Sequence, residues 1–357
     1  MSERPKWATW VTRISLAVAI VALVFTIRDV GVRTLGGYLR RIGWWWIAII
    51  ALEVLNTTLH STALRAFAAP DKLRMRSAIL AQLAGRAVNA VTPSGNLGEL
   101  VKMSVLTEVV NPSRAVATVL LYNVVSFTIE LGLVAVAAPF FALLVPMPTG
   151  LRWLFVALGI VCFVISLGIY LLVRRGMLAS VARAGVKLRI LSPARYQKWE
   201  DKLRGVDDKL RLVAGTSKRA RAFGISALLV SRISAIVLSM VIVYAVGKSV
   251  SIGFIAAWTV GSFPIYLSST LVPMGLGVSE GGYYGLFRTL GYNPAVAVTV
   301  VIARRCITIM YAAIGLVLVT TSETVQRVRA KQAVQVALPV VVSPLPIVPL
   351  AVADESE

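Results

Sequence analysis

The residues best suited to chemistry in this 357-residue chain are two glutamates, each closing a short stretch rich in proline and glycine. Glu99 ends the stretch 93–99 (PSGNLGE), and Glu280 ends the stretch 273–280 (PMGLGVSE), with apolar sequence on both sides of each. A carboxylate at membrane depth is costly unless it has a partner or a function. The two carboxylates could therefore bind a proton, pair with a cationic headgroup or gate a path. Alternatively, each could only cap the N-terminus of the helix that follows.

The prolines and glycines of the two stretches are the positions at which helices should break. Two such interruptions, one in each half of a membrane protein, are typical of a transport site between repeats. The predicted hairpin breaks are Pro93, Gly95, Gly98, Pro273, Gly275 and Gly277.

Positive charge accompanies the glutamates. Arg86 precedes the first break by one to two helical turns, Lys102 follows Glu99 on the same helical face, and Arg304 lies in the last apolar run. A guanidinium binds phosphate through paired donors, which favours a site for phosphate or an anionic headgroup. The alternative is charge balance against the glutamates, or snorkelling to the interface. Arg232 and Arg305 also supply positive charge near or within the spans. The family resemblance described below narrows the substrate-binding candidates to Arg86, Glu99, Lys102, Glu280 and Arg304.

No catalytic group, metal or cofactor is expected. The chain has one histidine, His60, and its two cysteines lie within apolar runs without metal-ligand or disulfide spacing. The glycine-rich stretches match neither a dinucleotide fingerprint nor a phosphate-binding P-loop.

The elements that must position these residues are membrane helices. The sequence is 57% hydrophobic with a mean hydropathy of +0.80, and apolar runs of about 18–25 residues are long enough to cross a hydrocarbon core. The runs lack the alternation of membrane strands. They are roughly Trp10–Ile27, Trp44–His60, Ala115–Ala138, Leu151–Val173, Phe223–Val246 and Pro294–Thr320.

The chain has a net charge of +21, and many of its basic residues lie in one loop, which indicates how the chain is oriented in the membrane. Fourteen Lys and Arg lie in the loop 174–221, which the positive-inside rule places in the cytoplasm. The apolar residues of this loop recur at helical spacing, which predicts an amphipathic helix on the anionic lipids of the inner leaflet, or a solvated helix packed on the bundle. No nucleic-acid module is recognisable, so nucleic acid is not an expected partner.

Successive apolar runs should cross the membrane in opposite directions, starting from that cytoplasmic loop. Two segments must then enter and leave the membrane on the same side. Each half then reads helix, helix, re-entrant hairpin, helix, and the halves face opposite ways. The predicted fold class is an all-α integral membrane protein of about six transmembrane helices and two re-entrant helical hairpins, arranged as an inverted repeat. We expect a multi-pass protein of the cell (inner or plasma) membrane with cytoplasmic N- and C-termini.

The predicted organisation follows from this scheme. Residues 1–150 form the first membrane repeat with its hairpin at 77–110, and 151–320 form the second, inverted repeat with the cytoplasmic loop and a hairpin at 251–290. Residues 321–357 form a cytoplasmic tail whose prolines predict an extended or disordered chain.

The two stretches carry a resemblance. The segment Asn89 to Lys102 resembles the first signature of the lysylphosphatidylglycerol synthase transmembrane-domain family of flippase-like proteins, and Leu271 to Gly281 resembles the second. Arg304 is similar to a basic position in the last span of that family. Lys102 stands where an arginine is expected, which weakens bidentate phosphate binding there. The resemblance implies lipid handling over roughly residues 10–320, without the soluble domain that synthesises aminoacyl lipids.

The predicted function is therefore translocation of an anionic lipid or a lipid-linked glycan between leaflets, with a membrane lipid or polyprenyl-linked molecule as substrate. Basic residues would hold the phosphate, and the carboxylates would gate or carry protons. The alternatives are a membrane-embedded lipid-modifying transferase and a scaffold for a lipid or glycan synthesis complex. Self-association into a homo-oligomer stays open.

Overall fold

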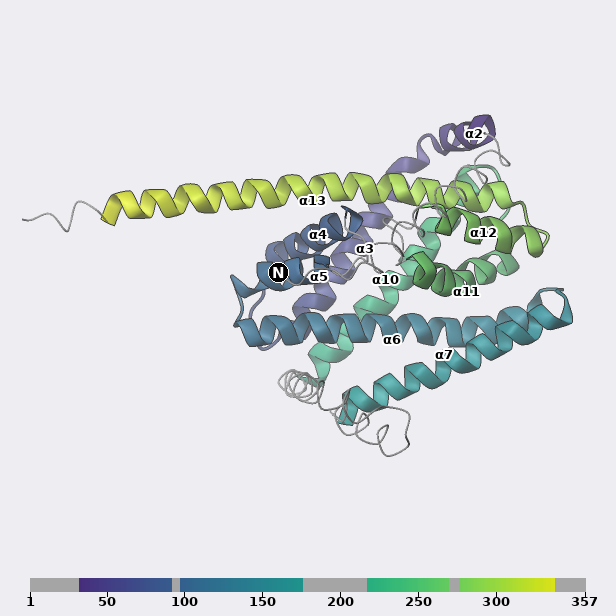
Figure 1. Cartoon of the computed structure of the whole chain (residues 1–357), viewed down its shortest axis with the longest axis horizontal. Coiled ribbons are helices and arrows are strands. Elements are labelled where there is room, and N and C mark those ends of the chain that lie inside the picture. The colour runs from purple at the N-terminus through teal and green to yellow at the C-terminus, as the bar shows by residue number, and fades with distance from the viewer. Residues whose placement is uncertain (1–31, 92–96, 176–216, 270–275, 338–357) are drawn as a thin grey trace, which may run out of the picture. The chain divides into compact units, whose positions relative to one another are not determined.

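The fold is all-helical over the part of the chain that the structure describes. The structure is a computed structural model, and it describes residues 32–91, 97–175, 217–269 and 276–337. Within these ranges every regular element is a helix (Figure 1). The helices are α2 (Val32–Ile42), α3 (Trp45–Ala68), α4 (Met75–Val91), α5 (Leu97–Thr107), α6 (Pro112–Leu144), α7 (Thr149–Arg175), α10 (Lys218–Ala245), α11 (Ile252–Ser269), α12 (Val278–Thr289) and α13 (Pro294–Ala337).

Six of the described helices are long and apolar enough to cross a membrane. Five of them, α3, α6, α7, α10 and α13, coincide with predicted runs, which confirms the predicted class of multi-pass α-helical membrane protein. The predicted run Trp10–Ile27 lies outside the described residues. The sixth candidate span is α11, which the sequence placed in the second hairpin.

Helix–break–helix units occur where the two hairpins were predicted. In the first, α4 packs on α5, and in the second, α11 packs on α12 (Figure 1). With 11 and 12 residues, α5 and α12 are each too short to cross a hydrocarbon core, which takes about 20 residues. Re-entry from one side and the inverted repeat stay predictions. Pro93, Gly95, Pro273 and Gly275 lie outside the described residues.

Local sequence explains where the helices begin. The side chain of Asn111 accepts a hydrogen bond from the backbone N–H of Ser113, and Pro112 is the first residue of α6. An asparagine cap followed by proline is a strong helix start, because the cap satisfies a free N–H and proline has none to satisfy. The same pair, Asn293 and Pro294, begins α13.

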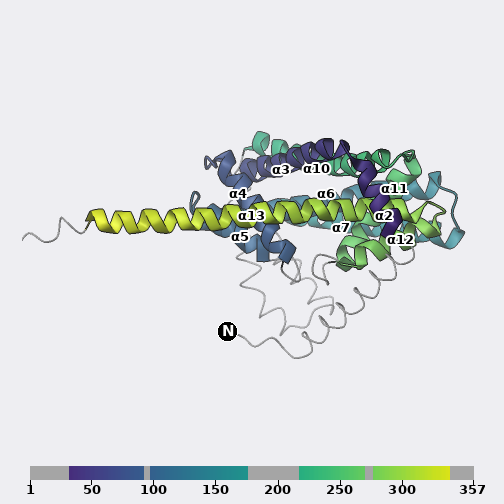
Figure 2. The ribbon, with the colours of Figure 1, turned by 90° about the horizontal axis from the view of Figure 1, so that it is seen from above.

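The two halves meet through α3 and α10, which lie antiparallel along one edge of the bundle (Figure 2). At one end of the pair, Trp45 of α3 packs edge-on against Tyr244 of α10, with ring centroids 5.3 Å apart. At the other end, Phe67 of α3 lies over Gly224 of α10, where a Cβ would come within 2.6 Å of the ring. The small residue lets the two helices approach closely, as in many membrane proteins.

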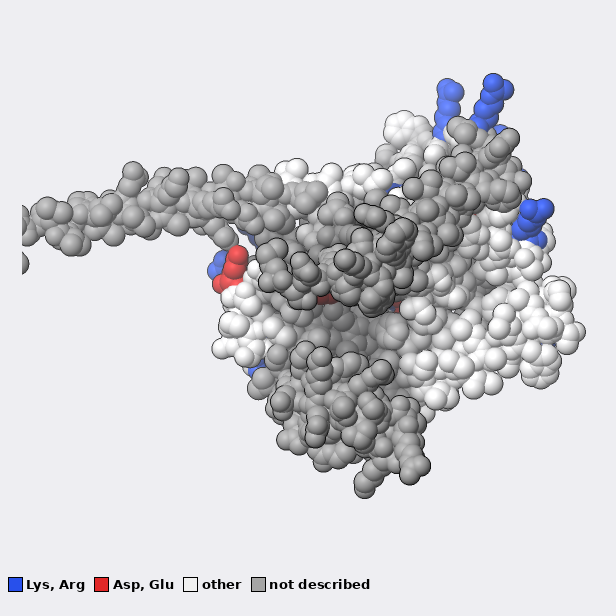
Figure 3. Space-filling model, viewed as in Figure 1, with Lys and Arg blue, Asp and Glu red and all other residues white. Residues whose placement is uncertain are grey.

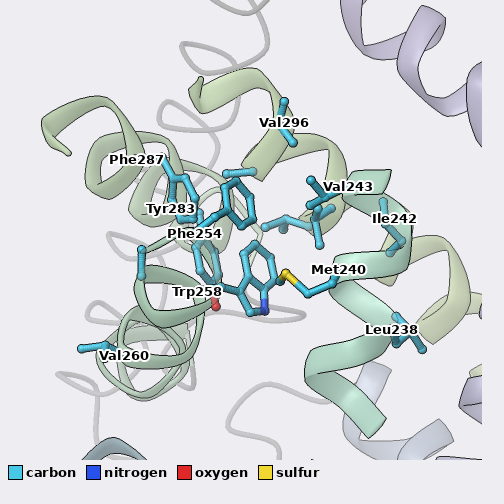
Figure 4. Close-up of a cluster of buried hydrophobic side chains, with 14 of the residues drawn as sticks. Leu238, Met240, Ile242, Val243, Phe254, Trp258, Val260, Tyr283, Phe287 and Val296 are labelled. Atoms are coloured by element: carbon cyan, nitrogen blue, oxygen red, sulfur yellow. The ribbon is translucent and has the colours of Figure 1, made fainter. Parts of the chain in front are cut away.

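An aromatic cluster holds the second hairpin in place. Trp258 of α11 stacks on Tyr283 of α12 with centroids 4.1 Å apart, and Phe254 packs against Phe287 at 4.6 Å. Met240 of α10 points toward the Trp258 ring (Figure 4). These buried rings provide a large packing area that fixes α12 against α11 and α10.

The outer surface agrees with a membrane setting. Large apolar side chains of α7 and α10 are exposed, and most of the described surface in Figure 3 is uncharged, with basic side chains standing out over α2. Soluble monomers rarely expose apolar areas of this kind.

The predicted tail and loop are only partly described. The sequence predicted an extended or disordered tail from residue 321, whereas α13 continues to Ala337. No proline occurs between Pro294 and Pro339, and residues 321–337 contain good helix formers. Most of the predicted amphipathic loop 174–221 lies outside the described residues.

Candidate functional site

Glu99 lies in the first turn of α5 and is held by two neighbours. Its Oε1 is 2.9 Å from Lys102 Nζ, and its Oε2 accepts a hydrogen bond from Asn123 Nδ2 of α6 at 2.7 Å. The spacing of three residues predicted that Lys102 and Glu99 would share a helical face, and this contact is confirmed. Lys102 Nζ also lies over the ring of Tyr122, 5.2 Å from its centroid.

Glu280 lies in the first turn of α12 and is fully buried. It forms an ion pair with Arg305 of α13, in which Arg305 Nη1 contacts Oε1 and Nη2 lies 3.3 Å from Oε2. The backbone N–H of Gly277 also donates to Glu280 Oε2 at 2.9 Å. Glu280 is therefore both a helix cap and a member of a buried ion pair.

The other predicted cations have partners of different kinds. Arg86 of α4 bonds Glu53 Oε1 of α3 at 2.5 Å. Arg304 Nη1 instead donates to the carbonyl oxygen of Ala235 and to Ser239 Oγ of α10, both at 3.0 Å. Arg304 thus joins α13 to α10, and the neighbouring Arg305 is the residue that reaches the hairpin glutamate.

A further ion pair joins α6 to α10. Arg232 Nη2 lies 2.8 Å from Glu130 Oε2 and donates to Ser126 Oγ at 3.0 Å. The Nε of Arg232 is buried without a hydrogen-bond partner among the described residues. A buried donor of this kind is uncommon and costly.

We call these charged residues together the polar cluster. It contains four carboxylates, each with one cation, and a fifth cation, Arg304, held by neutral oxygens. Charge balance was one of the two interpretations of the basic residues, and the pairing agrees with it. The members are Glu53, Arg86, Glu99, Lys102, Glu130, Arg232, Glu280, Arg304 and Arg305.

Cations from three helices act electrostatically on His60 of α3. The ring of His60 on α3 lies within the electrostatic reach of Arg86, Lys102 and Arg232, which belong to α4, α5 and α10. Its Nδ1 is 2.7 Å from the hydroxyl of Tyr122. Positive charge from both halves of the chain therefore acts on His60.

Charges of the first hairpin act electrostatically on the end of α11. The hydroxyl of Tyr266, three residues before the end of α11, is within electrostatic reach of two ion pairs. These pairs are Glu99 with Lys102 and Glu130 with Arg232. Tyr266 of α11 therefore responds to the charges of Glu99 and Lys102 in α5.

The contacts of the two hairpin glutamates correspond. Asn123 lies eleven residues after Pro112, the first residue of α6, and Arg305 lies eleven residues after Pro294, the first residue of α13. Each hairpin glutamate thus reaches the same position of the helix that follows its hairpin. Neither Asn123 nor Arg305 was among the predicted site residues. Counting eleven residues from the proline of each Asn-Pro helix start would have found both.

The arms of the two hairpins are also joined at corresponding places. In the first hairpin, Asn89 Oδ1 accepts from the backbone N–H of Gly98 at 2.7 Å. In the second, Ser269 Oγ and Ser279 Oγ are 3.0 Å apart. Each contact links a residue shortly before the break to the residue that precedes the glutamate.

Two of the predicted break glycines have specific roles. Gly277 caps α12 with a φ of +74°, a conformation that residues with a Cβ rarely adopt. Gly98 lies inside α5, where it allows α4 and α5 to approach closely.

The cluster can hold charge at membrane depth. Its ion pairs offset the cost of burying single charges, and its guanidinium and ammonium groups are suited to phosphate oxygens. Among the described residues, no three His, Cys, Asp or Glu side chains gather as a metal site would require.

The fold and the cluster define a multi-pass α-helical membrane protein with charged residues next to two broken helices. Residues 13–315 match the family described as the lysylphosphatidylglycerol synthase TM region. The chain belongs to this family, as the two signatures predicted. Neither a search of curated proteins nor a search of solved structures gave a match.

Proposed function

We propose that this protein moves an anionic lipid, or a lipid-linked glycan, between the leaflets of its membrane. The observation that carries the proposal is the polar cluster, in which both helix–break–helix units and four longer helices contribute charge. Charged residues within membrane spans are rare, and they mark substrate paths more often than structure. Family membership supports a lipid-related function.

The charge of the cluster favours an anionic substrate. Five cations stand against four carboxylates, so the cluster carries one excess positive charge when all its members are ionised. A phosphodiester headgroup carries one negative charge and would balance that excess. The acyl or polyprenyl chains would stay in the lipid beside the exposed apolar faces.

The corresponding contacts of Glu99 and Glu280 support the proposed inverted repeat. Two hairpins that meet the next helix at the same position would give similar surfaces to the two sides of the membrane. Such a repeat is a common basis of alternating access in transporters.

The test is lipid translocation in reconstituted liposomes. Fluorescent phosphatidylglycerol, phosphatidic acid and a polyprenyl phosphate would be placed in one leaflet, and their arrival in the other would be followed by quenching with membrane-impermeant dithionite. We expect at least one lipid to move about tenfold faster than in protein-free vesicles, which corresponds to roughly 1.4 kcal/mol of barrier.

Arg232→Gln provides the matched loss-of-function variant, because it removes one charge of the cluster. Arg33→Gln is the control, because Arg33 is an exposed arginine of α2 outside the cluster. Rates equal to those of empty vesicles for every lipid would reject the proposal. The proposal would also be rejected if Arg232→Gln and wild type moved lipid at the same rate when equal amounts of folded protein are reconstituted.

A further inference from the structure

The two hairpin glutamates occupy corresponding positions but differ in their surroundings. The side chain of Glu280 is 0% exposed, whereas that of Glu99 is 22% exposed. Both begin a short helix, and both reach the twelfth residue of the next long helix. Comparing Glu99 with Glu280 therefore separates the role of the first hairpin from that of the second.

Glu280 is tied to another helix by charge. Both terminal nitrogens of Arg305 contact its carboxylate, and Gly277 adds a backbone donor. A buried carboxylate with a paired, charged donor is strongly held, since removing either partner leaves a single buried charge. The second hairpin is therefore fixed to α13.

Glu99 is tied much less firmly. Its ionic partner, Lys102, belongs to the same helix, so this ion pair fixes no other element. Its contact with α6 is one hydrogen bond from the neutral amide of Asn123. The side chain of Lys102 is buried, at 7% exposed, whereas that of Glu99 is 22% exposed. Water or a headgroup can therefore reach the carboxylate of Glu99, and a change of partner there breaks no ion pair between helices.

The space around Lys102 is shaped to hold its side chain. A Cβ on Gly85 of α4 would lie 2.6 Å from Lys102 Cε, so the aliphatic part of Lys102 passes directly over Gly85. The ring of Tyr122 lies next to the ammonium group, and His60 anchors the Tyr122 hydroxyl. The ammonium group is thereby held near the end of the first hairpin.

We infer that the repeated site has divided its roles. Glu280 and Arg305 are positioning residues that clamp the second hairpin, whereas Glu99, Lys102 and Asn123 form the exchangeable site that receives the headgroup. Lys102 binds a phosphate oxygen, while Glu99 and Asn123 bind a hydroxyl or amine of the same headgroup. This inference rests on the proposed function, because it names the headgroup site of that lipid.

The first measurement compares thermal unfolding of the matched variants Glu99→Gln and Glu280→Gln in detergent. We expect Glu280→Gln to lower Tm by about 5–10 °C, because it removes the charge of a fully buried carboxylate that pairs α12 with Arg305 of α13. We expect Glu99→Gln to lower Tm by about half as much or less, because the ion pair that it removes lies within one helix and water can reach the side chain at this position, which is 22% exposed. Arg305→Lys should recover part of the loss caused by Arg305→Gln. Equal destabilisation by the two glutamate variants would overturn the division of roles.

The second measurement uses dihexanoyl phosphatidic acid as the probe and records its binding by calorimetry. Lys102→Gln should weaken binding about 10–100-fold, the effect of losing a hydrogen bond from a charged group. Gly85→Ala should weaken it in the same direction by displacing Lys102 without removing its charge. Lys72→Gln, an exposed lysine, is the control and should bind as wild type does.

Unchanged affinity in Lys102→Gln would overturn the assignment of the exchangeable site. The outcome is separable from that of the proposed function, because binding is measured without transport. Phosphatidic acid binding that depends on Lys102 in a protein that moves no lipid would retain this site and reject translocation. If the Lys102→Gln variant still moves lipid and binds phosphatidic acid as tightly as wild type, the assignment of the site is rejected and the proposed function is retained.

Discussion

Replacing Gly98 by alanine should push apart the two arms of the first hairpin. A Cβ at this position would lie 2.5 Å from Asn89 Cγ and closer still to the carbonyl oxygen of Gly85. Because a backbone carbonyl cannot move aside as a flexible side chain can, α4 or α5 must shift. Overpacking of this kind costs about 1–3 kcal/mol. Losing the bond from the Gly98 N–H to Asn89 Oδ1 adds about 1 kcal/mol, so the expected total is about 2–4 kcal/mol.

The assay is reversible unfolding of the purified protein in mixed detergent micelles, followed by far-ultraviolet circular dichroism. Gly285→Ala is the matched control, since Gly285 is an exposed residue of α12 with open space where its Cβ would be. Alanine there should be neutral or stabilising by up to about 1 kcal/mol, because it favours the helix. A Gly98→Ala protein within about 0.5 kcal/mol of wild type would refute the close approach of α4 and α5.

Three further outcomes are expected. Gly277→Ala should lower stability by about 1–2 kcal/mol in the same assay, because its φ of +74° strains a residue with a Cβ. Trp258→Ala should cost about 3–5 kcal/mol through loss of the buried stack, whereas Trp153→Ala, at a residue 67% exposed, should change stability by less than about 1 kcal/mol in detergent. Cysteines introduced by Lys72→Cys and Glu108→Cys, at positions that flank the helix pair α4–α5, should react with an impermeant maleimide from the same side of the membrane. Labelling from opposite sides would replace the re-entrant hairpin with a crossing.

Features set by neighbours in the chain could be predicted from the sequence. The apolar runs gave five of the candidate spans, since crossing a hydrocarbon core depends only on length and composition. The contact between Glu99 and Lys102 followed from helical spacing. The helix pairs α4–α5 and α11–α12 occur where hairpins were predicted, and the two signatures gave the family.

Features set by contacts between distant helices could not be predicted in this way. Arg304 was the predicted substrate-binding residue in the last apolar run, but Arg305 is the residue that contacts Glu280. Adjacent residues point about 100° apart around a helix, so only the rotation of α13 against α12 decides between them. Similarly, the pairing of Glu53 with Arg86 depends on how α3 packs on α4.

The role of Gly98 illustrates the same division. Its sequence context suggested a break, because glycine is a poor helix former. The structure places it inside α5, opposite Gly85 of α4, where absence of a side chain allows close packing. The sequence by itself determined which segments are apolar enough to cross a membrane and which residues supply charge near or within them. Only the tertiary structure decided which charges meet, because pairing across tens or hundreds of residues depends on the packing of whole helices.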